Sequence, residues 1–176
     1  MKSPVKVSQS AAGPSLWARV DYQQRPFVEG LFCSLSEDAS GITFSVEHTP
    51  DNPDLMIPFT ASRTTTVLTL TFAAPHLLVT GDNVGIYNSS FNGNYAVAST
   101  PSTTTLTVAV PNSGPTTDIP TAVAALCRVF ADATIAGKTA RIYGNNLVPV
   151  LASRINNTAW TAGTSTLEIV QGHARG

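Results

Sequence analysis

The sequence predicts an all-β protein with the architecture of a sandwich or a barrel. Short runs rich in Thr, Val and Leu alternate with Gly, Asn and Pro turns between Arg63 and Gly114, as in an array of strands. Segment 42–48 alternates between apolar and polar residues, which is the period of a half-buried strand. The sequence lacks the pattern of long amphipathic helices, which favours all-β layers.

The first elements follow a loose arm. Residues 1–15 contain Pro, Ser, Gly and two lysines without periodicity, which is typical of a flexible N-terminal segment. Modest alternation over 17–22 and an apolar run over 27–36 predict the next strands. Segment 42–48, with Ile42, Phe44 and Val46 on one face, is expected to form a hairpin with 27–36. Turn-forming residues at 49–54 end this part.

The middle and the end of the chain are also predicted to form short strands separated by turns. The Thr-rich array predicts strands near 64–72, 77–88, 91–99 and 102–110, followed by a linker at 111–120. Segment 123–130 fits either two turns of helix or a strand, and the β-type spacing after it favours a strand. The last strands are expected within 146–157 and 164–172.

Composition limits the classes of partner. The 176 residues include 43% hydrophobic and 12% charged residues, about half the usual charged share, and the formal net charge is −1. The pI is about 6.3 and the mean hydropathy is +0.11. Such a chain lacks the basic field that nucleic acid or an anionic membrane attracts, so neither is an expected partner. We predict a soluble protein made in a cytoplasm, because the N-terminus lacks the continuous apolar core of a secretory signal. In that reducing compartment, Cys33 and Cys127 are expected to be buried thiols.

No residue pattern predicts catalysis, a cofactor or a metal. The histidines His48, His76 and His173 have no metal-ligand spacing, and we interpret them as structural or surface residues. A Ser–His–Asp triad lacks any local signature such as G-x-S-x-G. The acidic residues that a glycosidase would need are interpreted as turn and solvent-face residues: Glu29, Glu37, Asp38, Glu47 and Asp51. The Gly81–Asn83 and Asn92–Asn94 segments are interpreted as turns rather than calcium loops.

Both flanks of the chain resemble small virion proteins of tailed bacteriophages. The likeness covers segments 21–52 and 154–172. It is carried by Tyr22, Pro26, Phe27, Val46, Glu47, His48 and Thr49, and then by Asn156, Thr158, Trp160, Thr161, Gly163, Thr164, Leu167, Val170, Gln171 and Gly172. In that family these motifs frame one compact β-domain.

The middle segment is separately similar to a small β-module that recurs in phage tail and other virion proteins. Its matching residues are Pro75, His76, Gly81, Asp82, Val84, Ile86, Phe91, Asn92, Gly93, Tyr95, Val97 and Leu106. Phe91 stands where the pattern usually has Tyr, and Gly85 replaces a polar residue. Together the two resemblances imply a split β-sandwich or jelly-roll-like domain with a small inserted β-module. The implied boundaries are 1–15 for the arm, 16–54 plus 121–176 for the anchoring sandwich, and 55–120 for the insertion.

The resemblance implies a non-enzymatic structural protein of a virion assembled in the host cytoplasm. The leading hypothesis is a capsid decoration or cement protein, with the major capsid protein or other virion proteins as partners and with homo-oligomers expected. The alternatives are a tail or neck protein (adaptor, tube-associated or fibre-anchoring) and a domain that binds a host receptor or surface glycan. The candidate interaction residues are Lys2, Val5, Val7, Trp17, Tyr22, Phe27, Trp160, His173 and Arg175, and the candidate exposed residues of the module are Tyr87, Phe91, Asn92 and Tyr95.

Overall fold

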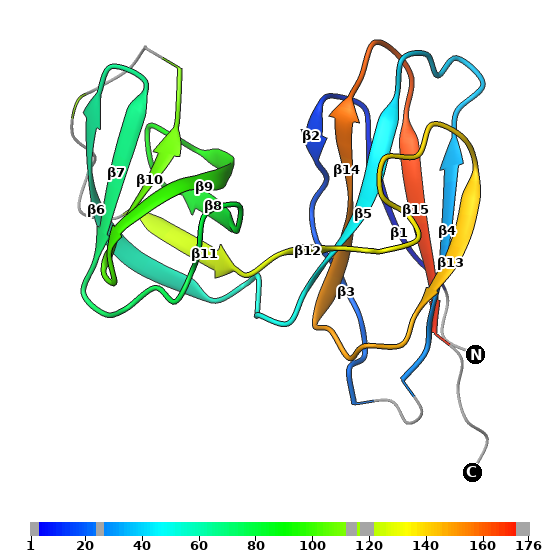
Figure 1. Cartoon of the computed structure of the whole chain (residues 1–176), viewed down its shortest axis with the longest axis horizontal. Helices are drawn as coiled ribbons and strands as arrows, with labels where there is room; N and C mark the ends of the chain where they lie inside the picture. Colours follow the sequence, from blue (N-terminus) through cyan, green and yellow to red (C-terminus); the bar gives the residue numbers. More distant parts are fainter. Residues whose placement is uncertain (1–3, 24–26, 112–115, 117–121, 172–176) are drawn as a thin grey trace. The chain divides into compact units, whose positions relative to one another are not determined.

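The chain divides into two compact all-β units. A computed structural model describes residues 4–23, 27–111, 116 and 122–171. Unit 1 is built from Met1–Pro50 and Phe130–Gly176, and unit 2 from Asp51–Val129 (Figure 1). The described residues form strands, turns and bends without a helix, which confirms the predicted fold class. They accordingly include no helix able to cross a membrane.

Unit 1 is a sandwich of two antiparallel sheets. The first sheet has the strand order β1-β15-β4-β13, and the second has the order β12-β5-β14-β2, with β3 also paired to β14. The first sheet consists of β1 (Val5–Gln9), β15 (Ser165–Gln171), β4 (Glu29–Leu35) and β13 (Ile142–Asn146). The second consists of β12 (Phe130–Ala131), β5 (Thr43–Thr49), β14 (Ala152–Ala159), β2 (Gly13–Pro14) and β3 (Ala18–Arg19).

The core of unit 1 lies between the two sheets. Alternation along β5 turns Phe44 and Val46 inward, and both are fully buried, as is Ile155 of β14. The first sheet contributes Leu31 and Leu167 from the opposite side. Full burial of each such side chain stabilises the fold by about 1.5–3 kcal/mol. The inner face predicted for segment 42–48 is therefore confirmed.

The predicted hairpin between segments 27–36 and 42–48 is wrong. β4 pairs with β15 and β13, whereas β5 pairs with β14 and β12. The connection from β4 to β5 crosses from the first sheet to the second, and the connection from β14 to β15 crosses back. The two connections are joined by a β-bridge between Ser40 and Ala162. Strands β4 and β5 therefore lie on opposite faces of the core, and so do β14 and β15.

The expected loose arm at 1–15 is also wrong for its described part. Val5–Gln9 pairs along β15 from Val5 opposite Ile169 to Gln9 opposite Ser165. Gly13–Pro14 then pairs with Asn156 and Asn157 of β14 in the second sheet. The segment carries no hydrophobic run, and its order comes from backbone pairing with β15 and β14. The Asn157 side-chain amide adds hydrogen bonds to the carbonyls of Gln9 and Ala11.

Unit 2 is a closed six-stranded antiparallel barrel with the order β10-β7-β6-β11-β8-β9. Its strands are β6 (Met56–Thr64), β7 (Val67–Phe72), β8 (Asn83–Tyr87), β9 (Gly93–Ser102), β10 (Thr105–Ala109) and β11 (Val123–Cys127). Inward-facing apolar side chains such as Leu70, Ile86 and Leu106 fill the barrel. Segment 123–127 is thus a strand, which is the alternative that the sequence pattern favoured.

The boundaries of the barrel differ from the expected 55 and 120. Strand β11, expected in the anchoring domain, closes the barrel instead, because Ala124 pairs with Ile57 of β6 on one side and with Ile86 of β8 on the other. At the base of the unit, Arg128 forms an ion pair with Asp51, with 2.6 Å between Nη2 and Oδ1. The two ends of the inserted segment therefore lie side by side.

Candidate functional site

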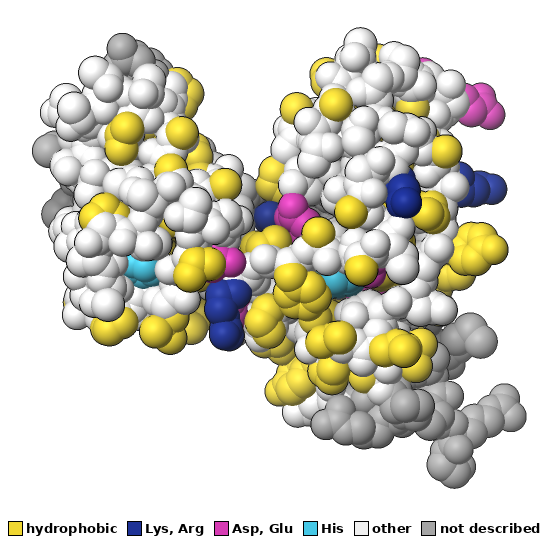
Figure 2. Space-filling model, viewed as in Figure 1, with side chains coloured by type: hydrophobic (Ala, Val, Ile, Leu, Met, Phe, Trp, Pro, Cys, Tyr) yellow, Lys and Arg dark blue, Asp and Glu magenta, His cyan; other side chains and the backbone are white. Residues whose placement is uncertain are grey.

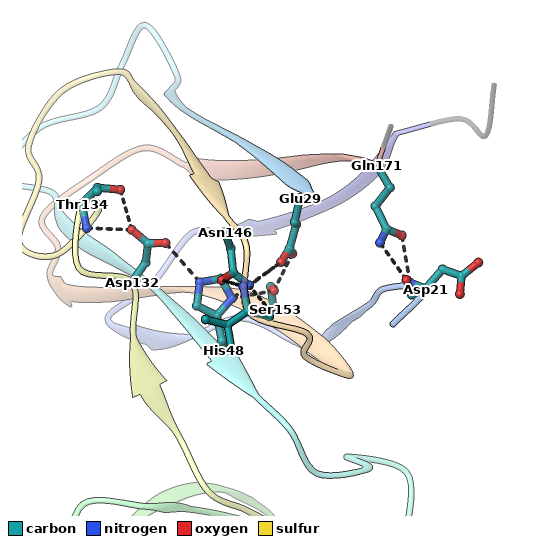
Figure 3. Close-up of polar contacts among 9 residues, drawn as sticks. Asp21, Glu29, His48, Asp132, Thr134, Asn146, Ser153 and Gln171 are labelled. Atoms are coloured by element: carbon teal, nitrogen blue, oxygen red, sulfur yellow. Dashed lines mark hydrogen bonds and ion pairs between the residues drawn. The ribbon is translucent and has the colours of Figure 1, made fainter. Parts of the chain in front are cut away.

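A buried polar network crosses the interior of unit 1 around His48 (Figure 3). Alternation along β5 points His48 toward the core, where it is 1% exposed. Its Nδ1 lies 2.8 Å from the Oγ of Ser153 on β14, and its Nε2 lies 3.3 Å from the Oδ2 of Asp132. A serine, a histidine and an aspartate thus form a continuous series.

The network continues into the first sheet through Glu29 of β4. The Ser153 hydroxyl donates to Glu29 Oε1 at 2.6 Å, and the Asn146 side-chain amide donates to Glu29 Oε2 at 3.0 Å. Glu29 and Ser153 have no solvent exposure. The interpretation of Glu29 as a turn or solvent-face residue is therefore wrong, and this carboxylate joins the two sheets instead.

Asp132 has the most hydrogen bonds of the group. Its Oδ1 accepts from Thr134 N at 2.8 Å, Thr134 Oγ1 at 2.6 Å and Ile135 N at 2.9 Å, while Oδ2 faces His48. Burial by itself raises the pKa of a carboxyl group, but the hydrogen bonds from Thr134, His48 and Ile135 outweigh burial and lower the pKa of Asp132. The carboxylate therefore stays ionised inside the sandwich.

The directions of these hydrogen bonds follow from the acceptors. The Ser153 hydroxyl donates to Glu29, so the Ser153 oxygen is left to accept from His48 Nδ1. His48 Nε2 faces the Asp132 carboxylate, which can only accept, so Nε2 donates there.

The geometry differs from that of a catalytic triad in two ways. In a serine hydrolase, Nε2 faces the serine and Nδ1 the aspartate, whereas His48 has the opposite orientation. The Ser153 hydroxyl is also enclosed and bonded to Glu29, so no substrate atom reaches it unless the sandwich opens. The network is suited to hold the two sheets in register, which agrees with the structural reading of His48.

A second polar cluster lies on the outer face of the second sheet. Glu47 of β5 receives hydrogen bonds from Arg154 Nε at 2.8 Å and from the Asn156 amide at 2.6 Å. The Arg154 guanidinium lies 4.2 Å from the ring centroid of Trp17, and Arg154 is 3% exposed. Trp17, expected to be an interaction residue, covers this ion pair and is itself half-buried.

The other candidate interaction residues of unit 1 differ in exposure. Tyr22 is 46% exposed, Val5 40% and Trp160 37%, and the Trp160 indole donates to the Gly163 carbonyl at 2.9 Å. Phe27 is buried in the core, so the expectation of an accessible Phe27 is wrong. Val7 is partly buried and packs against the same core cluster. The remaining candidates lie outside the described residues: Lys2, His173 and Arg175.

The motif residues of the barrel fix a loop between β7 and β8. His76 Nδ1 accepts from Leu78 N at 3.1 Å, so its Nε2 donates to the carbonyls of Ser102 and Thr105 at 3.1 and 3.3 Å. Asp82 accepts from Val79 N at 2.8 Å and from Val129 N at 2.9 Å. These bonds support the interpretation of His76 as a loop-fixing residue.

Three of the four module residues expected on the surface are at least partly accessible. Tyr87 is 36% exposed and Asn92 is exposed, while Tyr95 is half-buried, donates from its hydroxyl to the Phe91 carbonyl at 3.0 Å, and has a pKa raised by burial. Phe91 is 5% exposed and belongs to the barrel core, so its expected exposure is wrong.

Exposed apolar side chains line a shallow groove on the outer face of the first sheet. The groove has a volume of about 580 Å³ and is lined by Phe32, Arg141, Tyr143, Glu168 and Val170, among others. Phe32 is 50% exposed and lies directly opposite Tyr143, which is 78% exposed. Figure 2 shows mostly uncharged atoms on the face that it presents.

Both cysteines are buried, as predicted. Burial, with a smaller contribution from the charge of Asp132, raises the pKa of Cys33 to about 12, so this thiol is a poor nucleophile. Within the described part of the chain, no cluster of three or more His, Cys, Asp or Glu side chains is arranged to hold a metal ion.

Comparison of the chain with protein-family models, curated proteins and solved structures gives no match. The resemblance to virion proteins therefore depends on the motif residues alone.

Proposed function

We propose that this chain is a non-enzymatic structural component of a phage virion, a decoration protein that binds the capsid shell in many copies. The observation that carries the proposal is the split architecture. The two flanks that resemble virion proteins fold into one sandwich, and the segment that resembles the phage β-module forms a closed barrel between β5 and β12. Each resemblance thus corresponds to a unit with its own core.

The structural roles of the motif residues support this reading. His48 joins the buried network, Glu47 forms the ion pair with Arg154, and Trp160 closes the turn between β14 and β15. Gln171 accepts from Asp21 N at 2.8 Å and donates to its carbonyl at 3.2 Å, which fixes the segment before β4 (Figure 3). Residues that maintain a framework are expected to recur in proteins that share a fold, whatever surface each protein binds.

The distribution of polar chemistry favours a binding role over a catalytic one. His48, Ser153 and Glu29, which are residue types common in catalysis, are hydrogen-bonded to one another inside the sandwich. The exposed surface carries Thr and Ser hydroxyls and scattered aromatic side chains. Hydrogen bonds and apolar contacts made by such surface side chains are individually weak. Many copies on a repeating shell gain strength from avidity, which suits a decoration protein.

Counting this chain in purified particles tests the proposal. Virions made from the genome that encodes it are purified, and the chain is quantified against the major capsid protein by mass spectrometry. A decoration protein is expected at a fixed ratio to the capsid subunit, on the order of hundreds of copies. A count of about six or twelve assigns the chain to the tail or neck and contradicts the decoration role. Absence from particles contradicts the virion role itself.

A further inference from the structure

The sheet edges of this protein are protected in different ways. Unpaired strand edges invite other chains, and proteins commonly block them with Lys, Pro or very short strands. The first sheet ends on one side at β1, which carries Lys6 in an ion pair with Glu168 at 2.8 Å. The second sheet ends at β12 and β2, which are two residues long, and β2 includes Pro14. The barrel of unit 2 is closed.

Strand β13, at the other end of the first sheet, has none of these protections. Its five residues, Ile142–Asn146, contain no charge and no proline. Among the described strands it pairs with β4 alone, and Figure 1 shows it at the margin of the sheet. The strand is closed at its end by Asn146, whose amide donates to the Val148 carbonyl and whose Oδ1 accepts from Val148 N, both at 3.0 Å.

The same margin displays the most exposed aromatic side chain of the described residues. Tyr143 is 78% exposed, and its cross-strand neighbour Phe32 is 50% exposed. Beyond the strand, Leu147 is 67% and Val148 57% exposed. A strand edge that no other described strand covers, next to large apolar side chains, is the arrangement to which another β-strand can add, with main-chain hydrogen bonds from the edge and apolar contacts from the face.

We infer that β13 pairs antiparallel with β13 of a second copy of this chain, so that the two first sheets join across a two-fold axis. Two copies satisfy each other because each contributes the same unprotected edge, and the neutral strand does not repel itself. With Gly144 opposite Gly144, Tyr143 faces Asn145 of the second copy. Arg141, which precedes the strand, then faces Leu147, so the two arginines lie about 20 Å apart at opposite ends. This pairing does not depend on the virion role.

Sedimentation equilibrium of the full chain tests the pairing. The expected mass rises with concentration from 18.4 kDa toward twice that value up to about 100 µM. Tyr143→Lys places a charge on the edge and is expected to weaken association at least tenfold. Tyr143→Phe, which keeps the ring, and Val5→Lys, which adds the same charge at the β1 edge, are expected to associate as the wild type does. Circular dichroism of each variant confirms that it is folded.

Hydrogen exchange of the wild type locates the contact without any substitution. The β13 amides are expected to exchange more slowly at high concentration, while the β1 amides do not change with concentration. The inference is overturned by a wild-type chain that stays monomeric over the whole range, by an association that Val5→Lys weakens as much as Tyr143→Lys does, or by β13 amides whose exchange is independent of concentration.

Discussion

His48 is buried, so the protein must satisfy both of its ring nitrogens internally. It does so with Ser153 and Asp132, and Glu29 and Asn146 complete the set. A buried polar group without a partner costs about 1–3 kcal/mol, so every member of the network depends on the others. A network of this kind contributes to one defined register of the sheets more than to total stability.

Asp132→Asn is expected to lower the free energy of unfolding by about 2 kcal/mol. The amide retains an oxygen for Thr134 and Ile135, but its NH₂ group then replaces the charged acceptor that Asp132 Oδ2 offers to His48 Nε2. Urea denaturation followed by circular dichroism measures the change. Glu37→Gln, the matching change at an exposed acid, is expected to stay within about 0.5 kcal/mol of the wild type. Equal losses in the two variants would show that Asp132 has no special role.

The same substitution predicts a pH dependence. The pKa of Asp132 is lower in the folded protein than in the unfolded chain, so the folded state binds its proton less readily. The stabilisation from Asp132 is therefore complete above the unfolded value of about 4 and is lost as the pH falls through the folded pKa. The difference in unfolding free energy between wild type and Asp132→Asn is expected to shrink as the pH falls below about 4. A difference that grows on acidification would contradict the assignment.

Sequence reasoning could place His48 but not its partners. Alternation puts His48 in phase with Phe44 and Val46, which already indicates an inward-facing side chain. Ser153 and Asp132 lie 105 and 84 residues further along the chain, and nothing local connects them to β5. Phe27 and Phe91 illustrate the same limit, because the type of an aromatic residue does not say whether the core or the surface holds it.

At the level of elements, local pattern predicted strands well and pairings poorly. The runs at 27–36 and 164–172 contain β4 and β15, and the run at 42–48 covers β5 except for its last residue, Thr49. The pairing of β4 with β15 and of β5 with β14 depends on connections that cross between sheets, and periodicity holds no information on that choice. The order of Val5–Gln9 was missed because edge strands need little hydrophobic pattern when a neighbour supplies the hydrogen bonds.

The turn between β14 and β15 gives a test at this level. Gly163 has φ +86°, and a Cβ there would lie 2.4 Å from the Ala39 Cα, so the turn packs directly against the neighbouring backbone. Gly163→Ala is expected to destabilise the protein by about 3 kcal/mol or more, from left-handed strain and the clash together. Gly137, at φ +63°, has open space around the same position, so Gly137→Ala is expected to cost about 1 kcal/mol. Thermal denaturation compares the melting temperatures of the two variants. Equal decreases would contradict the crossing of the β4–β5 and β14–β15 connections.

At the level of the whole molecule, the barrel is an insertion whose two ends meet. Phe130 pairs with His48 across the second sheet, and antiparallel neighbours have Cα atoms about 5 Å apart. On the barrel side, Arg128 donates from its backbone N to Asp51 Oδ2 at 2.7 Å, in addition to the ion pair. Hydrogen bonds from Arg128 and its charge outweigh burial and lower the pKa of Asp51.

Replacing Asp51–Val129 by a turn of about four Gly and Asn residues is therefore expected to leave unit 1 folded. The shortened chain should unfold cooperatively and retain a slowly exchanging core around Phe44, Ile155 and Leu167, because these residues contact one another and no barrel residue belongs to their cluster. Two-dimensional NMR and urea denaturation measure this. A shortened chain without dispersed amide signals would contradict the independence of the sandwich.

We propose that this chain binds a virion shell through unit 1 and carries the barrel as an accessory. Co-sedimentation with particles that lack the protein tests this binding for three purified chains: the full chain, the shortened chain and the barrel of residues 51–129. We expect the full and shortened chains to sediment with the particles at similar stoichiometry and the barrel to stay in solution. Binding by the barrel without the sandwich, or no binding by the full chain, would contradict it.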